Sequence, residues 1–248
     1  MDKLLYVAMS GAKETLRAQA ANNHNLANSS TTGFKADLSA FQSRAVTGPG
    51  YASRVYATDS TVGWDHGVGA IEQTGNPLDL AIHGDGFMVV QDATGNEAYT
   101  RAGDLHVDPN GQLLTAIGLP VMGDNGPISV PPHSSISVGG DGTVSIVPLG
   151  QTPNTISTVA RVKLVNPPVD TIQRGNDGLF RSTSGQPLEA DASVKVDSGS
   201  LESSNVNLAS CMVNMIELSR HYDMQVKALH TAEEDGQASA KLLQSSGA

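Results

Sequence analysis

The two ends of the chain decide the fold, and the first of them reads DKLLYVAMSGAKETLRAQAANNHNLAN over residues 2–28. It contains no proline and a single glycine, so nothing in it interrupts a helix. Apolar or small residues recur in alternating steps of four and three, which predicts a helix with a heptad stripe. The stripe consists of Leu5, Met9, Ala12, Leu16, Gln19, Asn23 and Leu26. Residues 29–32 compete for backbone hydrogen bonds and Gly33 accepts a positive φ, so they are expected to end this helix.

The other end of the chain carries a matching pattern. Asn205 and Asn207 offer N-cap side chains, and proline is absent from position 188 onward. A second helix is therefore expected from about residue 207 to 243. Its stripe consists of Leu208, Met212, Met215, Ser219, Tyr222, Val226 and Leu229.

Between the two helices, short apolar segments alternate with glycine and proline, which is typical of strands joined by turns. Residues 136–138 and 143–146 flank a Gly-Gly-Asp-Gly turn and predict a hairpin. Further strands are expected at residues 78–82, 86–90, 159–165 and 194–196.

The predicted fold class is thus α+β, with a discontinuous N- and C-terminal helical coiled-coil domain flanking a β-rich central body. Four regions are expected. They are an N-terminal helix (residues 1–36), a partly extended connecting region (37–75), a β-rich outer domain (76–200) and a C-terminal helix (201–248).

The composition argues against several classes of protein. The 248 residues include 15 Lys and Arg against 25 Asp and Glu, a net charge of −10, and no basic patch that would bind nucleic acid. The single cysteine, Cys211, rules out an intrachain disulfide and a cysteine-based zinc cluster, and is expected to be a small packing residue. No apolar run is long enough to span a bilayer, and no cleavage site follows the short apolar run at the N-terminus. We expect a soluble protein that is cytoplasmic or exported without a cleaved signal peptide.

One cluster of titratable residues resembles half of a calcium loop. Asp104, His106 and Asp108 alternate along an expected strand, so their side chains share one face. However, Pro109 stands where such a loop needs glycine, and Thr115 stands where it needs a bidentate glutamate. We therefore expect a solvated strand and turn here, and no metal site.

Catalytic motifs are also missing. The sequence has no phosphate-binding Gly-Lys-Ser/Thr loop, no Gly-x-Ser-x-Gly elbow and no His-Glu-x-x-His. We predict no catalytic residue, no cofactor and no small-molecule substrate. A β-rich enzyme centred on His83 or His106 is kept as the alternative from another class.

Asparagines gather at the end of the first predicted helix. Asn22, Asn25 and Asn28 occur at every third position, and Asn23 lies in the stripe. Buried amides in a helical seam fix its register, which is the role favoured here; exposed amides at a fraying helix end are the alternative.

The helices also need a surface to pack against. Residues 4–9 are apolar on almost every face, so a single partner helix leaves much of this surface in water. We expect the helices to bury themselves against other subunits; packing on the chain's own β-rich body is the alternative.

Four stretches resemble motifs of the bacterial flagellar rod and hook proteins, in the same order along the chain. They are NLANSSTTGFK at residues 25–35, LDLAIHGDGF at 78–87, YTRAG at 99–103 with GQLLT at 111–115, and GSLESSNVN at 199–207. The opening residues 1–12 are most similar to those of proximal-rod members.

This resemblance implies a structural subunit of the proximal rod, the shaft that transmits motor torque and surrounds the export channel. It implies assembly with other proximal and distal rod subunits and with copies of itself. It also implies contact with the flagellar export apparatus during secretion and a place in the periplasmic part of the basal body. A distal-rod or hook-related paralogue is the alternative within the family.

The residues expected to form the assembly interface lie on both terminal helices and just after the first. They are Leu5, Met9, Leu16, Asn23, Leu26, Asn28, Phe34, Leu208, Met212, Met215, Tyr222, Val226 and Leu229.

Overall fold

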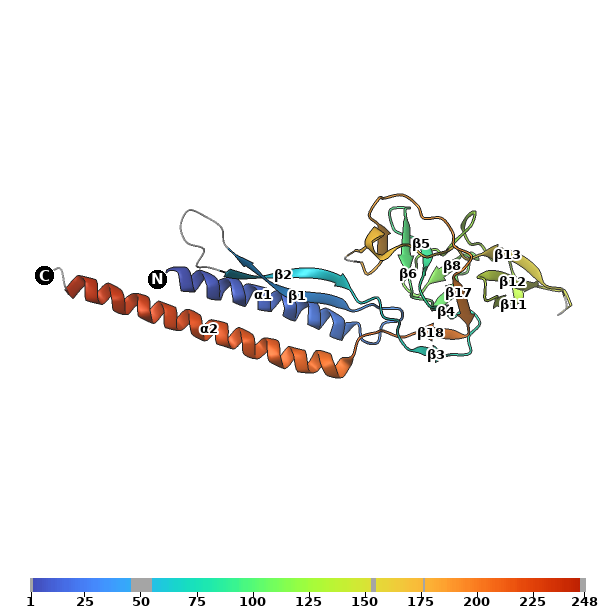
Figure 1. Cartoon of the computed structure of the whole chain (residues 1–248). Coiled ribbons are helices and arrows are strands. Elements are labelled where there is room, and N and C mark those ends of the chain that lie inside the picture. Colours follow the sequence, from blue (N-terminus) through green and yellow to red (C-terminus); the bar gives the residue numbers. More distant parts are fainter. Residues whose placement is uncertain (1, 46–54, 153–154, 176, 246–248) are drawn as a thin grey trace. The chain divides into compact units, whose positions relative to one another are not determined.

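The computed structural model describes residues 2–45, 55–152, 155–175 and 177–245 (Figure 1). The chain divides into two compact units. Unit 1 comprises residues 1–28, 37–65 and 206–248, and unit 2 comprises residues 29–36 and 66–205.

Unit 1 consists of two long helices and one hairpin. Helix α1 (Asp2–Ala27) and helix α2 (Leu208–Ser245) run side by side in opposite directions, as Figure 1 shows. Both predicted helices are therefore confirmed. The N-cap of α2 is also confirmed, because the Oδ1 atom of Asn207 accepts a hydrogen bond of 3.0 Å from the backbone N–H of Ser210.

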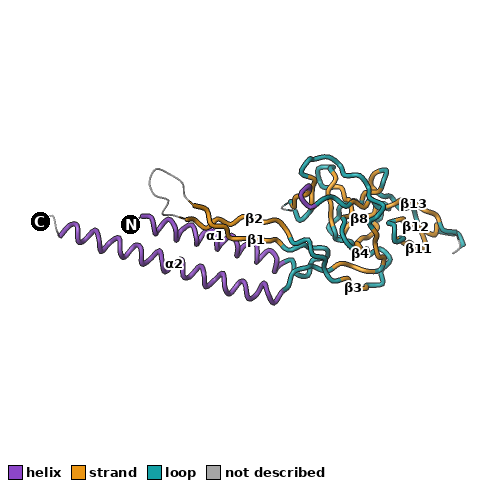
Figure 2. The backbone as a smooth tube through the Cα atoms, in the orientation of Figure 1, coloured by secondary structure: helices purple, strands orange, loops and turns teal. Residues whose placement is uncertain are grey.

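The hairpin lies in the region that was expected to be partly extended. Strand β1 (Asp37–Ala45) pairs antiparallel with strand β2 (Val55–Trp64), and the pair packs along α1 (Figure 2). One register shift falls between Leu38 and Ser39. Within unit 1, α1 is therefore covered by two elements, the helix α2 and the β1–β2 hairpin.

Small and polar side chains form the buried face of α1. This face consists of Ala8, Ala12, Glu14, Thr15, Ala18, Asn22 and Asn25. Ala12 is the stripe member that lies in this buried face, whereas the large members Leu5, Met9 and Leu16 are 38%, 50% and 49% exposed. One residue step turns about 100° around a helix, so the buried face lies beside the stripe. Small side chains allow close approach of the backbones; a Cβ atom on Gly11 would lie 2.9 Å from the side chain of Gln225 on α2.

Unit 2 is built from short antiparallel strands in several small sheets. The largest sheet has the order β14 (Leu164–Val165), β5 (Phe87–Gln91), β6 (Glu97–Thr100), β16 (Phe180–Ser182) and β15 (Ile172–Arg174). A three-stranded sheet contains β11 (His133–Val138), β12 (Thr143–Pro148) and β13 (Ser157–Arg161). The two-stranded pairs are β3 (Ile71–Gln73) with β18 (Ser200–Glu202), β4 (Leu80–His83) with β17 (Lys195–Ser198), β7 (Leu105–Val107) with β8 (Leu113–Thr115), and β9 (Met122–Gly123) with β10 (Gly126–Pro127). One 3₁₀ turn, Val169–Thr171, precedes β15.

The predicted hairpin around residues 139–142 is confirmed as β11 and β12, with Gly142 at φ 83° in its turn. The segment 159–165, expected as one strand, is instead split between β13 and β14, which pair in different sheets. Most strands of unit 2 contribute to one aliphatic core. It is formed by Leu80, Ile82, Met88, Leu105, Leu113, Val121, Ile128, Val130, Val138, Val144, Ile146, Val162, Leu164, Val194 and Val196. The α+β class, with terminal helices flanking a β-rich region in the sequence, is confirmed.

Candidate assembly interface

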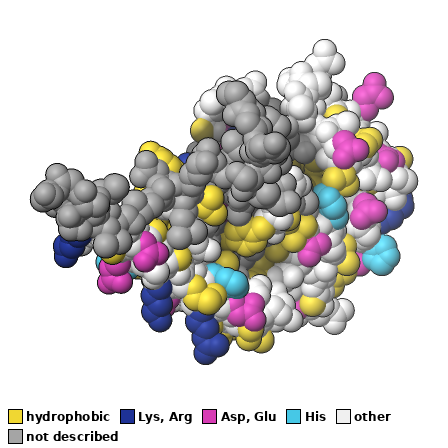
Figure 3. Space-filling view, turned by 60° about the vertical axis from the view of Figure 1, so that its left-hand side comes forward, with side chains coloured by type: hydrophobic (Ala, Val, Ile, Leu, Met, Phe, Trp, Pro, Cys, Tyr) yellow, Lys and Arg dark blue, Asp and Glu magenta, His cyan; other side chains and the backbone are white. Residues whose placement is uncertain are grey.

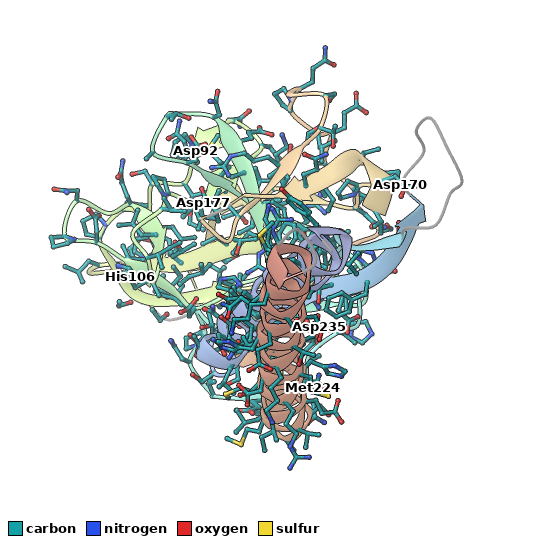
Figure 4. The ribbon with its side chains drawn as sticks, turned by 90° about the vertical axis from the view of Figure 1, so that its left-hand side faces the viewer. Asp92, His106, Asp170, Asp177, Met224 and Asp235 are labelled. Atoms are coloured by element: carbon teal, nitrogen blue, oxygen red, sulfur yellow. The ribbon has the colours of Figure 1, made fainter. Side chains whose placement is uncertain are left out.

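Large apolar side chains are exposed on three elements of unit 1, α1, β1 and α2. On α1 and β1 they are Leu5, Tyr6, Met9, Leu16, Leu38 and Phe41. On α2 they are Leu208, Met212, Val213, Ile216 and Met224. Figure 3 shows hydrophobic side chains reaching the surface, and Figure 4, which looks along α2, shows Met224 directed away from the helix. Exposed apolar surface of this extent marks a contact site.

The residues predicted for the assembly interface fall into three classes of exposure. Leu5, Met9, Leu16, Asn23, Leu208 and Met212 are exposed. Leu26, Asn28, Met215, Tyr222, Val226 and Leu229 are half-buried. Phe34 differs from the rest because it belongs to unit 2 and is buried there.

The clustered asparagines hold unit 1 together at one end. The Nδ2 atom of Asn22 donates to the carbonyl oxygen of Cys211 on α2 at 2.9 Å. Asn25 donates to the carbonyl oxygen of Asp37 at 2.9 Å and accepts from its N–H at 2.7 Å, which attaches the start of β1 to α1. Asn28 bonds within its own helix end, to the carbonyl oxygen of His24. Asn22 and Asn25 are buried, whereas the stripe residue Asn23 is exposed. A one-residue slip of either helix would break the Asn22 bond to Cys211, so this bond favours a single register.

Cys211 is buried in the first turn of α2. Burial raises the pKa of its thiol, so the reactive thiolate form is disfavoured. This agrees with its expected place as a small packing residue.

Unit 2 contains a buried ion-pair network. The Oε1 atom of Glu202 lies 2.7 Å from Nζ of Lys35, and its Oε2 atom lies 2.7 Å from Nε of Arg101. All three side chains are at most 3% exposed. The N–H of Gly69 donates to the same Oε1 atom at 2.8 Å. The carboxylate is thus held by two cations and one backbone amide.

The two cations bind backbone carbonyls with their other donors. Nζ of Lys35 donates to the carbonyl oxygen of Gly67 at 2.8 Å. The guanidinium of Arg101 donates to the carbonyl oxygens of Gly86 at 2.8 Å and Gly84 at 2.9 Å. Burial of ions is tolerated when each donor and acceptor is satisfied in this way.

The environment of Glu202 shifts its acidity. Burial raises the pKa of the carboxyl group, but the hydrogen bond from Lys35, the charge of Arg101 and the Gly69 amide outweigh burial. The pKa therefore lies below its usual value, and the group is ionised at neutral pH.

A second layer of contacts surrounds Phe34. The guanidinium carbon of Arg174 lies 4.3 Å from the centre of the Phe34 ring, and Nη1 of Arg174 donates to the carbonyl oxygen of Lys35 at 2.8 Å. Asn205 donates its N–H to the carbonyl oxygen of Phe34 at 3.2 Å and accepts from the N–H of Ala36 at 2.7 Å. Phe34 is therefore a packing residue of unit 2.

The four sequence motifs meet at this network. Lys35 comes from the first motif, the carbonyls of Gly84 and Gly86 from the second, Arg101 from the third and Glu202 from the fourth. None of these residues was predicted for the assembly interface; only their neighbour Phe34 was. The available signal was one charged residue in each of three motifs that are otherwise mainly small or uncharged.

The residues weighed for catalysis or metal binding are not assembled into such a site. His83 is exposed and lies 3.6 Å from Asp197, and His106 is exposed on β7. Asp108 accepts from the N–H groups of Gln112 at 2.7 Å and Asn110 at 3.0 Å, and these bonds lower its pKa. Residues 108–112 thus form the expected turn. Over the described ranges, no three His, Cys, Asp or Glu side chains are placed to hold a metal ion.

Neither α1 nor α2 contains, within its described residues, a stretch with the length and hydropathy of a membrane-spanning helix.

Comparison with known proteins covers the chain almost from end to end. Residues 5–35 match the family described as "Flagella basal body rod protein", and residues 81–146 match "Flagellar hook protein FlgE/F/G D1 domain". Residues 197–244 match "Flagellar basal body rod FlgEFG protein C-terminal".

Individual relatives agree with these matches. The chain is 43% identical to the flagellar basal-body rod protein FlgF of Salmonella typhimurium strain LT2, over 98% of this chain and 99% of the relative. It is 42% identical to FlgF of Escherichia coli strain K12 over the same shares. It is 32% identical to the rod protein FlgG of Buchnera aphidicola subsp. Schizaphis graminum, over 90% of this chain and 94% of the relative. The chain therefore belongs to the flagellar basal-body rod protein family, whose members are structural proteins that assemble with one another into the rod.

Proposed function

We propose that this chain is a subunit of the proximal rod. It assembles helically with copies of itself and with other proximal and distal rod subunits, and the resulting shaft transmits torque and surrounds the export channel. The subunit reaches the periplasm through the flagellar export apparatus, without a cleaved signal peptide.

One observation carries the proximal position. Identity to the FlgF relatives is 43% and 42% along nearly the whole length of both chains, whereas identity to the FlgG relative is 32%. The difference favours the proximal position over the distal paralogue.

The exposed apolar side chains of unit 1 support the proposed mode of assembly. In a single chain, α1 and α2 bury small and polar residues against each other and leave Leu16 and Met212 about half exposed. Complete burial of an exposed side chain of this size contributes about 1.5–3 kcal/mol, and covering the exposed half contributes about half of that, so contact between many subunits yields a large gain. We propose that the thirteen predicted interface residues act here, Phe34 through its support of unit 2. In this arrangement the terminal helices α1 and α2 line the channel, and the β-rich residues 76–200 face outward.

The test is a charge placed on the proposed surface. Leu16→Asp is expected to leave the folded chain intact in dilute solution, because the side chain is already half exposed. It is expected to abolish incorporation into the rod and motility in a strain whose own FlgF is deleted. Ile117→Asp is the matched control, since Ile117 is 69% exposed in unit 2 and outside the predicted interface. Normal motility with Leu16→Asp would contradict the proposed packing.

A second experiment tests the position in the shaft. The unmodified chain is expected to restore motility to a strain lacking FlgF and not to one lacking FlgG. Rescue only of the strain lacking FlgG would instead identify the distal paralogue.

A further inference from the structure

We propose that Lys35, Arg101 and Glu202 form a latch, which positions the two stretches through which unit 2 continues into α1 and α2. The latch then aids assembly by holding these two stretches in position, and the fold remains stable when the charges of the latch are removed. This inference rests on the proposed function as a rod subunit.

The latch joins the two stretches directly. The outgoing stretch, residues 29–36, follows α1 in the chain. The returning stretch, residues 203–205, comes directly before residues 206–248, the part of unit 1 that contains α2. The carboxylate of Glu202 binds Lys35, and the backbone carbonyl oxygen of Glu202 accepts a hydrogen bond of 2.8 Å from the N–H of Gly33. Three residues later, Asn205 binds backbone atoms of Phe34 and Ala36. The outgoing and returning stretches are therefore bonded to each other at several points along their length.

Two glycines bring backbone against backbone at the latch. Gly33 has φ +66°, and a Cβ atom there would lie 2.3 Å from the carbonyl carbon of Arg101. A Cβ atom on Gly69 would lie 1.8 Å from the carbonyl oxygen of Ser203. Contacts this close hold each stretch against another segment of unit 2, Gly33 against Arg101 and Ser203 against Gly69, because any side chain on either glycine would force the backbones apart.

Stability alone does not call for the charges of the latch. Two cations face one carboxylate, and both cations also donate to backbone carbonyls. Apolar side chains of similar size often replace such a buried network with no loss of stability. Charged hydrogen bonds are directional, however, and these reach carbonyls in separate segments at residues 67, 84 and 86. The directional bonds favour a role in positioning.

Two variants separate position from stability. Lys35→Met leaves Arg101 and Glu202 as a balanced pair and keeps an apolar stem in place of the lysine. The triple variant Lys35→Met, Arg101→Met, Glu202→Leu removes every charge of the latch. The control is Lys163→Met with Glu97→Gln, which removes another ion pair of 2.7 Å within unit 2.

Three measurements are made on the full-length chain. They are the thermal midpoint, the rate of chymotrypsin cleavage after the buried Phe34, mapped by mass, and motility in a strain lacking FlgF. For both latch variants we expect a midpoint close to that of the unmodified chain, cleavage after Phe34 about 5- to 30-fold faster, and loss of motility. The control is expected to be motile and to be cleaved after Phe34 at the original rate.

Other results overturn the latch. One is unchanged cleavage and motility in both variants; another is unfolding of both, which would make the network a requirement of the fold. Motility restored by the triple variant but not by Lys35→Met would also overturn it, since only stability would then matter. If the unmodified chain fails to restore motility, the proposed function fails instead, and the cleavage rate alone decides whether the latch holds Phe34.

Discussion

Units 1 and 2 bury opposite kinds of side chain. Unit 2 encloses aliphatic residues such as Leu113 and Val144, both with no exposed surface, together with a satisfied ion network. Unit 1 encloses alanines and amides and leaves Leu16, Met212 and Phe41 about half exposed. Since apolar burial drives folding, unit 2 gains most of its stability within the chain. Under the assembly proposed above, unit 1 gains a large part of its stability only when other subunits cover it.

The largest effect is expected from a substitution in the buried ion-pair network of unit 2. Glu202→Gln keeps the shape of the side chain but leaves Lys35 and Arg101 as buried cations without a carboxylate. Breaking a buried pair from one side costs about 3–5 kcal/mol, so the denaturant midpoint of unit 2 is expected to fall strongly. Urea unfolding followed by fluorescence of Trp64 for unit 1 and by hydrogen exchange for unit 2 measures the two separately. An equal loss from Gln substitution at the exposed Glu217 of α2 would contradict this assignment.

The next effect compares one leucine from each unit. Leu113→Ala, at a fully buried position in unit 2, is expected to lower the free energy of unfolding by about 2–5 kcal/mol. Leu16→Ala, at a half-exposed position of α1, is expected to stay within about 0.5 kcal/mol of the unmodified chain in dilute solution. Chemical denaturation at low protein concentration measures both. If Leu16→Ala destabilised the single chain as much as Leu113→Ala, the contrast between the units would be lost.

A smaller effect tests the close approach of the helices in unit 1. Ala18 is 3% exposed on the buried face of α1, so Ala18→Leu overpacks that face. Overpacking typically costs about 1–3 kcal/mol, and the loss should appear in the thermal unfolding of helical circular dichroism. The same substitution at the exposed Ala20 serves as the control and is expected to change little. A more stable Ala18→Leu chain would mean that the helices do not pack through small residues.

The elements that depend on local sequence pattern could be predicted from the sequence. Both helices, the Asn207 cap and the β11–β12 hairpin follow from periodicity, capping and turn chemistry. The face that α1 buries could not be predicted, because the heptad rule places large apolar residues inside, whereas this helix pair selects small ones. The large stripe residues therefore remain exposed and available for contact with another surface.

The latch residues were missed for a different reason. Lys35, Arg101 and Glu202 lie far apart in the sequence, and a charged residue alone is usually solvated. Only the fold shows that three motifs place their charges at one buried point. The alternative of an enzyme centred on His83 or His106 was wrong, since the chain belongs to a family of structural proteins.

The smallest effect concerns a carboxylate in a turn of unit 2, Asp92, whose side chain is 7% exposed. Asp92, labelled in Figure 4, accepts from the hydroxyl of Thr94 at 2.6 Å and from Arg181 at 3.1 Å. The Thr94 hydroxyl has the largest influence; burial opposes it, and the bonds from Arg181 and the N–H groups of Asn96 and Thr94 add to it. Together they lower the pKa of Asp92 from 3.8 to about 2.

Because the folded pKa of Asp92 lies below its ordinary value, its stabilising effect is complete above about pH 4 and is lost as the pH falls towards 2. Thr94→Ala removes the main hydrogen bond, so the pKa of Asp92 is expected to rise towards 3.8. A carboxyl NMR titration measures the shift. Asp141 is the internal control, since Thr143 lowers its pKa through the same Asp-x-Thr geometry and remains in place in the variant. If Asp92 keeps its low pKa without Thr94, Arg181 and the backbone amides hold the charge, and this turn depends on the same kind of cation contact as the latch.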